Sequence, residues 1–333
     1  MSTVTMVQAL NRALHDAMAE DERVLAFGED VGHTGGLFGV TAGLARTFGP
    51  GRCYDSPTAE SGILGTAVGM AMYGRIPVVE VQYDAYLYPA FEQLVSHVAK
   101  LRNRTRGKVA LPIVLRVPYG GIGTVEHHND SSEAYYAHTP GLHVVAPATV
   151  ADAYGLLREA IAAPDPVVFL EPKRLYTDTA DLELPVRTEP IGRAVVRRPG
   201  NSATVLAYGP AVPTALAAAE AARDRGYDLE VVDLRTLVPF DDETVRASVR
   251  RTRYAVVVHE ASGFAGVGAE IAARITEACF DDLLGPVQRV TGLDIPYPPP
   301  KLQHHHLPDA ERIVEAVERL YARGAQAFVS GAV

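Results

Sequence analysis

The carboxylate of Glu60 is the first candidate for chemistry in this sequence. It follows the polar stretch 55–58 and opens segment 61–73, which is apolar, glycine-spaced and helical in its periodicity. A carboxylate placed there lies at a helix start and near a core, where burial raises the pKa of a carboxyl group. Read alone, Glu60 is explained more simply as a helix cap or dipole partner.

Tyrosines and a histidine pair form a second candidate group. Tyr83 and Tyr86 lie in segment 80–91, and His128 ends a histidine pair in loop 119–138, between two predicted strands. Loops that follow the strands of parallel sheets commonly carry the chemistry of such folds. By residue type alone, the tyrosines suit a core or interface, and the histidines suit a surface or hydrogen-bonded position.

Two glycine-rich stretches and three consecutive histidines are weaker candidates. Residues 32–36 follow two acidic residues that would repel a phosphate, and residues 263–268 lack the Lys-Ser/Thr ending of a P-loop. Tight turns and helix packing explain both stretches. Residues 304–306 are all histidine, but three neighbours cannot all reach one ion from a regular element. We therefore predict neither a phosphate loop nor a metal site at these places.

Composition describes an ordinary globular protein. The 333 residues are 47% hydrophobic and 21% charged, which is enough to bury a core and favours two domains. The net charge is −9 and no stretch gathers Lys and Arg, so we expect no nucleic-acid partner. Two cysteines fit a reducing compartment, and no apolar run is long enough to span a bilayer. The expected location is the cytoplasm.

Strand and helix patterns alternate through the first half. Thr5 and Gln8 form a capping box for an amphipathic helix that ends near residue 20. Predicted strands and helices then alternate, which indicates a mainly parallel sheet covered on both faces. The strands are residues 24–27, 78–81, 113–117, 144–146 and 167–170, and the helices are residues 61–73, 88–102 and 151–162.

A second domain follows a break in this pattern. From about Leu175 to Pro199 the sequence changes to Pro, Thr and mixed charges, as in an interdomain linker, which we place at residues 181–199. Alternation then resumes, with strands at 203–208, 229–232, 255–258 and 287–290 and helices at 211–225 and 271–278. We predict an α/β fold with domains at residues 1–180 and 200–333, the second being smaller.

Ordered motifs give the chain a family resemblance. The matching segments are residues 28–30, 55–60, 63–73, 80–102, 118–121, 169–176, 232–237, 258–260 and 307–312. Together they resemble the β subunits of the thiamine-diphosphate-dependent decarboxylating component of 2-oxo-acid dehydrogenase complexes, over nearly the whole chain. The resemblance implies a transketolase-like architecture: a pyrimidine-binding domain with a mainly parallel sheet, then a C-terminal domain that mainly serves subunit contacts.

The resemblance assigns roles to three residues. Glu60 matches the carboxylate that hydrogen-bonds N1′ of the aminopyrimidine and favours the imino tautomer that deprotonates the thiazolium. Tyr86 matches the aromatic residue that packs on the pyrimidine, with Tyr83 as the nearby second choice. His128 matches the histidine that assists acyl transfer to the lipoyl group, a task that suits a group titrating near neutrality.

Other positions match less closely. Residues 129–133 replace the usual Ser-Gln after the histidine, and Thr58 stands beside the cofactor where relatives have a hydrophobic residue. Glu29 matches an acidic position that some relatives use in a solvated proton path, although a turn role is also open. Some relatives bind a monovalent cation such as K⁺ in this subunit, with ordinary loop packing as the alternative here. The corresponding residues are Leu111, Ile113, Ala160, Ala163 and Asp165.

A missing motif implies a partner. The Gly-Asp-Gly…Asn motif that holds Mg²⁺ and the diphosphate in thiamine enzymes does not occur. The resemblance places that motif on an α subunit, in an α₂β₂ heterotetramer that serves a lipoylated acyltransferase. The implied reaction is oxidative decarboxylation of a 2-oxo acid, with branched-chain acids favoured and pyruvate the second choice.

Three other functions remain to be separated from this one. They are a thiamine-dependent acyl or acyloin transferase, a non-catalytic scaffold subunit, and a nicotinamide oxidoreductase. The last is disfavoured because acidic residues 29–30 replace the phosphate-binding glycine turn.

Overall fold

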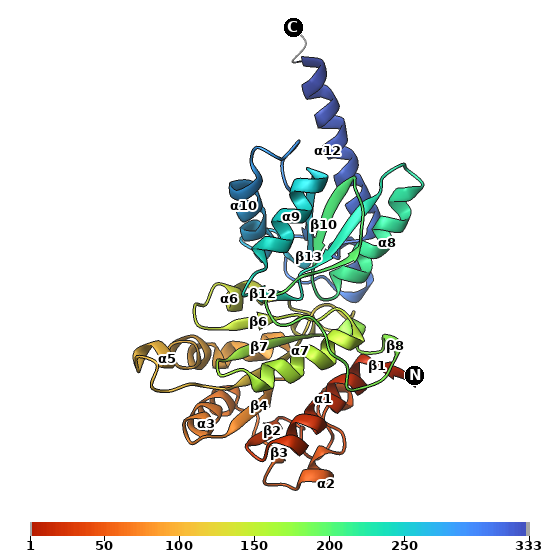
Figure 1. Cartoon of the computed structure of the whole chain (residues 1–333). Helices are drawn as coiled ribbons and strands as arrows, with labels where there is room; N and C mark the ends of the chain where they lie inside the picture. Colours follow the sequence, from red (N-terminus) through yellow and green to blue (C-terminus); the bar gives the residue numbers. More distant parts are fainter. Residues whose placement is uncertain (1, 331–333) are drawn as a thin grey trace. The chain divides into compact units, whose positions relative to one another are not determined.

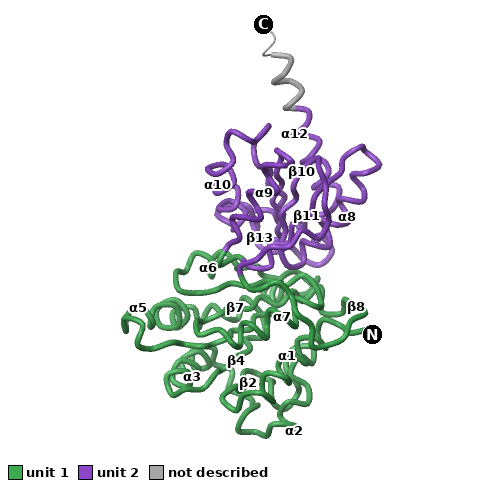
Figure 2. Tube along the Cα trace, viewed as in Figure 1, with its two compact units in different colours: residues 1–191, 237–239 green, residues 192–236, 240–333 purple. Residues whose placement is uncertain are grey.

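The computed structural model describes residues 2–330, with side chains described up to residue 322. The chain divides into two compact units, Met1–Ile191 with Leu237–Pro239, and Gly192–Thr236 with Phe240–Val333 (Figure 2). The division after Ile191 falls inside segment 181–199. Strand β9 (Val195–Arg198), within that segment, belongs to the sheet of the second unit.

The first unit is built on a seven-stranded sheet. Its order is β12-β6-β7-β5-β4-β2-β3, and the pairs from β6 to β3 are all parallel. The predicted mainly parallel sheet is therefore confirmed. The strands are β2 (Val24–Gly28), β3 (Cys53–Asp55), β4 (Ile76–Glu80), β5 (Val114–Tyr119), β6 (His143–Val145), β7 (Val167–Pro172) and β12 (Thr236–Val238).

Two helices cover one face of this sheet. Helices α1 (Met6–Glu20) and α7 (Val150–Ala162) lie against each other (Figure 1). Alternate strand residues, including Ala26, Val78 and Val114, join them in one buried cluster. The capping box at the start of α1 is confirmed, because Thr5 and Gln8 exchange both hydrogen bonds.

Short elements make up most of the rest of this unit. They are α2 (Leu44–Phe48), α3 (Glu60–Met72), α6 (Glu133–Ala137), and the single turns η1 (Leu37–Gly39), η4 (Glu126–His128) and η5 (Lys173–Leu175). A small antiparallel pair, β1 (Ser2–Thr5) with β8 (Thr179–Leu182), was not predicted. Both strands are only four residues long, and β1 has a single apolar residue, Val4, so the pair gives only a weak local signal.

The predicted single helix over 88–102 is wrong. The segment is a 3₁₀ stretch η2 (Asp84–Ala90), a single turn α4 (Phe91–Gln93), a π-helical η3 (Leu94–Val98) and α5 (Leu101–Arg104). Pro89 has no backbone N–H to donate, so it can stand in the first turn of an α-helix but not further along, and residues 84–90 before and around it form 3₁₀ turns.

The second unit holds a five-stranded sheet. Its order is β14-β13-β10-β11-β9, with β9 antiparallel to β11 and the other pairs parallel. This agrees with the predicted second α/β region. Its remaining elements are β10 (Ala203–Ala207), β11 (Leu229–Asp233), β13 (Ala255–Ser262), β14 (Gln288–Gly292), α8 (Ala211–Arg223), α9 (Asp242–Thr252), α10 (Val267–Cys279), η6 (Pro300–Leu302), α11 (Gln303–His306) and α12 (Ala310–Ser330). Within the described residues, no helix combines the length and apolarity that crossing a membrane requires.

Candidate active site

A cleft of about 510 Å³ lies where β2, β3 and β4 end. The carboxyl ends of parallel strands are the usual place for a ligand in such sheets. Four of its residues were predicted from the sequence, namely Glu29, Thr58, Glu60 and Tyr86. The full lining is Glu29, Asp30, Asp55, Ser56, Thr58, Glu60, Gln82 and Tyr86.

Glu60 is the first residue of α3 and lines this cleft half-buried. It is not the capping residue, because the N-cap position is Ala59, which makes no side-chain cap. Helix α3 is largely apolar around its circumference. In its first turn the polar side chains are those of Glu60 and Ser61. The helix thus presents a carboxyl group to the cleft without using it for its own end.

Glu29 is the buried carboxylate of the cleft. The preceding Gly28 lets β2 approach β4 closely, since a Cβ there would lie 2.4 Å from the carbonyl oxygen of Glu80. Glu29 is 8% exposed, and its Oε1 atom is buried with no hydrogen-bond partner among the described residues. Burial, followed by the charges of Glu60 and Asp30, raises its pKa. An unpartnered buried carboxylate of this kind indicates that another group completes the cleft.

Three polar residues that sequence reasoning missed shape the rim. The Asp55 carboxylate accepts hydrogen bonds from the backbone N–H groups of Gly32 at 2.7 Å and His33 at 3.2 Å. The Gln82 amide donates to Asp30 at 3.0 Å. Asp55 and Gln82 lie at or just after the ends of β3 and β4, so strand-end position was the signal that could have identified them.

His128 is joined to the cleft through two tyrosines. Its ring lies parallel to that of Tyr83, with centroids 3.9 Å apart, and its Nε2 atom is 3.0 Å from the Tyr86 hydroxyl. Burial, then the nearby His127 and Lys173, lowers the pKa of His128. The lowered pKa favours the neutral imidazole, which has one nitrogen that donates and one that accepts a hydrogen bond.

The loop that carries His128 is anchored by η2. The Asp84 carboxylate accepts from the Ser132 backbone N–H at 2.6 Å and from the Tyr136 hydroxyl. The Tyr88 hydroxyl donates to Asp130 at 3.0 Å and lies 2.8 Å from the Ser132 hydroxyl. Asp130 and Ser132, which depart from the family pattern after His128, therefore hydrogen-bond the loop to η2.

The five residues predicted to hold a monovalent cation lie before β5 and β7. The Leu111 carbonyl accepts from Ile113 at 2.8 Å, and the Ile113 carbonyl accepts from Val167 at 2.9 Å. The Ala160 carbonyl accepts from Ala163 at 3.3 Å, and Asp165 is bonded to Arg102 at 2.6 Å. A carbonyl oxygen has two lone pairs, so these three backbone bonds leave room for a cation. The side chain of Asp165 is already paired with a charge.

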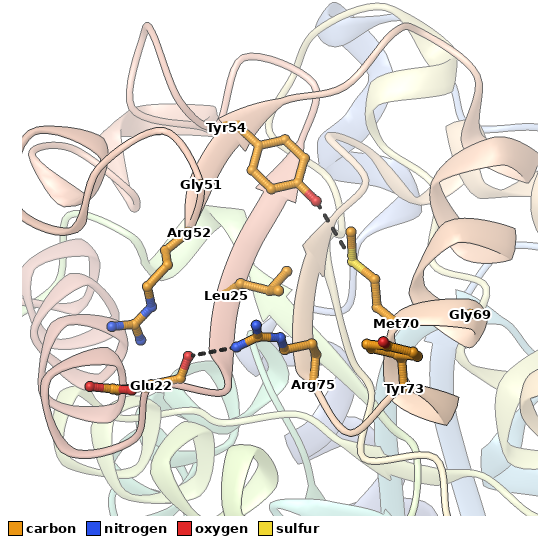
Figure 3. Close-up of a pocket in the computed structure, with 9 residues that line it drawn as sticks. All are labelled: Glu22, Leu25, Gly51, Arg52, Tyr54, Gly69, Met70, Tyr73 and Arg75. Atoms are coloured by element: carbon orange, nitrogen blue, oxygen red, sulfur yellow. Dashed lines mark hydrogen bonds between the residues drawn. The ribbon is translucent and has the colours of Figure 1, made fainter.

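A larger hollow of about 720 Å³ lies at the opposite, amino-terminal ends of β2, β3 and β4 (Figure 3). Its Arg52 donates to the backbone carbonyls of Met18 at 2.7 Å, Asp21 at 2.9 Å and Val24 at 2.7 Å. These bonds close the end of α1, where carbonyls lack helical partners. Arg52 is therefore accounted for by the fold, and none of the residues described as lining this hollow has a buried side-chain N or O atom without a hydrogen-bond partner.

The histidine run 304–306 lies in the second unit, in α11. His306 is buried and accepts the Leu293 backbone N–H at 3.3 Å. In the part of the chain that the structure describes, no three His, Cys, Asp or Glu residues gather as a metal group.

Comparison with known proteins identifies the family to which this chain belongs. Residues 2–179 match the family described as "Transketolase, pyrimidine binding domain", and residues 192–313 match "Transketolase, C-terminal domain". A structure described as "Split gene transketolase, inactive beta4 tetramer" shares the fold, with a TM-score of 0.79 at 22% identity, over 96% of this chain and 99% of that chain.

Sequence relatives are closer. The 3-methyl-2-oxobutanoate dehydrogenase subunit beta of Mycobacterium tuberculosis is 54% identical over 96% of this chain and 92% of its own length. The pyruvate dehydrogenase E1 component subunit beta of Leifsonia xyli subsp. xyli is 47% identical over 97% and 96%. The 2-oxoisovalerate dehydrogenase subunit beta of Pseudomonas aeruginosa is 41% identical over 96% and 95%. The chain therefore belongs to the β subunits of the 2-oxo-acid dehydrogenases, within the transketolase-like family.

Proposed function

We propose that this chain supplies half of a thiamine-diphosphate site, at which a 2-oxo acid is oxidatively decarboxylated and its acyl group passes to a lipoyl carrier. The observation that carries the proposal is the cleft itself. It combines a buried carboxylate without a hydrogen-bond partner among the described residues, Glu29, with a helix-start carboxylate, Glu60, and an aromatic ring, Tyr86.

The cleft residues suit the pyrimidine end of the cofactor. Glu60 would share a proton with N1′ of the aminopyrimidine, Tyr86 would pack on the ring, and Glu29 and Thr58 would border it. Tyr83 would act indirectly, by stacking on His128. When bound, the cofactor supplies the carbanion chemistry, while the protein supplies binding, orientation and electrostatics.

His128 would serve the transfer step. The lipoyl disulfide would be the two-electron oxidant, because its S–S bond breaks as one sulfur takes the acyl group. An imidazole hydrogen-bonded to Tyr86 could give a proton to the other, released sulfur and later take one back. Its position on an anchored loop favours a fixed orientation over a mobile one.

The partner is an α subunit in an α₂β₂ heterotetramer. This chain lacks the motif that holds Mg²⁺ and the diphosphate, so another chain must provide both. A lipoylated acyltransferase would take the acyl group. The cytoplasm suits both free thiols, Cys53 and Cys279, which are buried.

Branched-chain 2-oxo acids are the proposed substrates. Two of the relatives above, at 54% and 41% identity, are named for branched-chain acids, although one at 47% is named for pyruvate. A panel of 2-oxo acids measured on the co-purified complex tests this preference, and a higher kcat/KM for pyruvate would reverse it.

We also propose a monovalent-cation site at Leu111, Ile113, Ala160, Ala163 and Asp165. Thermal unfolding of the complex in KCl and in choline chloride at equal ionic strength tests it. Stabilisation specific to K⁺ is expected, and equal melting temperatures would remove the site.

Glu60→Gln tests the central proposal. In the co-purified complex we expect a loss of decarboxylation of about 10²–10⁴-fold, the usual contribution of a positioned acid or base. Glu22→Gln, at the opposite hollow, is the matched control and should retain full activity.

Each outcome separates a rival function. Unchanged activity in Glu60→Gln would indicate a scaffold subunit. Turnover that needs an aldehyde acceptor and ignores lipoylated carrier would indicate the acyloin transferase.

A further inference from the structure

A buried lysine, Lys173, lies near His128 and has no role in the function proposed above. Lys173 directly follows β7 and is 5% exposed. Its Nζ atom lies over the ring of Tyr83, 5.6 Å from the centroid. Tyr83 in turn lies parallel to His128 at 3.9 Å. One tyrosine ring therefore contacts both an ammonium group and the imidazole.

The neighbours of Lys173 explain how a cation is tolerated in this place. Asp84, 1% exposed, is close enough for the charge of Lys173 to act on its carboxylate, and Asp130 is also within that range. A buried ammonium group is kept charged only by such compensation. A cation over an aromatic face gains a further attraction, which strengthens when both groups are desolvated.

The same charge acts on the histidine. Burial lowers the pKa of His128 most, followed by His127 and then by Lys173. The titratable and charged groups that face His128 are Tyr86 from η2, Tyr83 from the N-cap of η2, His127 from its own turn, and Lys173 from η5. Of these, Lys173 is the only one from an element outside η2 and the histidine loop.

We propose that Lys173 is a positioning residue for His128. Its ammonium group holds the Tyr83–His128 stack in place and puts a positive charge close to the imidazole that contacts the Tyr86 hydroxyl. This inference rests on the proposed role of His128 in acyl transfer. A protonated imidazole could no longer accept a proton or the Tyr86 hydrogen bond. Without the ammonium group, the ring of Tyr83 would keep its contacts with His128 and Tyr86 but lose the one with Lys173.

The test measures the titration of His128 directly in the co-purified complex. The rate of deuterium exchange at C2 of the imidazole, followed against pH by mass spectrometry with fragment ions that separate His127 from His128, reports its pKa without any catalysis. In Lys173→Met we expect the titration of His128 to move to higher pH, because a nearby positive charge has gone. Lys173→Arg should keep the wild-type titration, and Lys100→Met, at an exposed lysine, is the matched control.

Activity gives a second readout. In Lys173→Met we expect acyl transfer to the lipoyl carrier to fall about tenfold, as expected for misplacing a reacting group, with KM for the 2-oxo acid unchanged. The pH profile of transfer should shift together with the titration of His128. Lys173→Arg should restore most of the rate.

Folding failure is kept apart from this result by a second variant. Lys173→Met combined with Asp84→Asn removes the buried cation together with its buried acidic neighbour, and leaves only the half-buried Asp130 of the two carboxylates on which Lys173 acts. It should assemble with the α subunit and show the same upward shift. An unchanged His128 titration in a folded Lys173→Met or in this double variant would overturn the inference. Failure of the proposed function would give a different pair of results. His128→Asn would keep full activity, while Lys173→Met, made alone, would still shift the titration of His128.

Discussion

The two ends of the seven-stranded sheet differ in whether their charged side chains have hydrogen-bond partners. At the amino-terminal ends of β2, β3 and β4, Arg52 is bonded to three backbone carbonyls, and the hollow beside it has no unmet polar group that we identify. At the carboxyl ends, Glu29 is buried with an oxygen that has no partner among the described residues. The larger hollow is thus the one explained by folding, and the smaller one is the candidate site.

A second contrast lies within the carboxyl end. The strand-end glutamates Glu80 and Glu171 are buried as deeply as Glu29. Arg116 lies between them, with its Nη1 atom 2.6 Å from Glu80 and its Nε atom 2.6 Å from Glu171. The Tyr176 hydroxyl donates to Glu171 at 2.6 Å, and the Leu37 N–H donates to Glu80 at 2.8 Å. Of the three glutamates compared here, Glu80 and Glu171 are therefore compensated by the fold, whereas the Oε1 atom of Glu29 has no hydrogen-bond partner among the described residues.

Of the substitutions that test this comparison, Arg116→Met should have the largest effect on stability. It leaves two carboxylates buried without their cation, which costs about 3–5 kcal/mol. Amide hydrogen exchange of peptides from β4, β5 and β7, measured by mass spectrometry on the complex, reports the lowered opening free energy. Adding Glu80→Gln and Glu171→Gln should recover part of the loss. No recovery would show that packing, and not charge compensation, is what Arg116 provides.

Arg52→Met should have a smaller effect, confined to stability. Removal of the bonds to the α1 carbonyls should cost about 2 kcal/mol, since hydrogen bonds to charged groups contribute about 1.5–3 kcal/mol. Exchange should rise at the end of α1 and the start of β2, while decarboxylation per folded complex stays unchanged. A specific loss of activity would make the amino-terminal hollow a functional site.

Glu29→Gln should have the smallest effect and the opposite sign. The folded pKa of Glu29 is raised above its ordinary value of 4.5, so the ionised carboxylate is disfavoured in the folded chain. Glu29 therefore contributes stability below pH 4.5, and that contribution is lost as the pH rises through the folded pKa. At pH 7 and without cofactor, Glu29→Gln should gain up to about 1 kcal/mol.

The pH series supplies the control for that variant. The difference between wild type and Glu29→Gln should vanish as the pH falls below 4.5. Destabilisation at pH 7 would instead show that the ionised carboxylate already has a partner in the folded complex.

Periodicity and caps were enough to predict much of the fold. The apolar runs that became β2, β4, β5, β7 and β10, and the capping box of α1, depend on neighbours in the chain, so local patterns reveal them. The separate 3₁₀, α and π pieces of residues 84–104 were missed. The apolar residues there recur at helical spacing, and that spacing does not reveal a change of helical pitch over a few residues. The β1–β8 pair joins two four-residue strands that are far apart in the sequence, so local patterns do not reveal it.

For the site, the sequence by itself determined the residue types and, through ordered motifs, the family. It placed Glu60 at a helix start and Tyr86 and His128 on separate segments, but it could not show that Tyr86 bonds to His128 or that Glu60 is not the cap. Only the tertiary structure decided which carboxylates are compensated, because Arg116 reaches Glu80 and Glu171 across three adjacent strands while no cation reaches Glu29 among the contacts described above. The physical reason is that charge compensation depends on distance and burial, and both arise only when strands distant in sequence become neighbours.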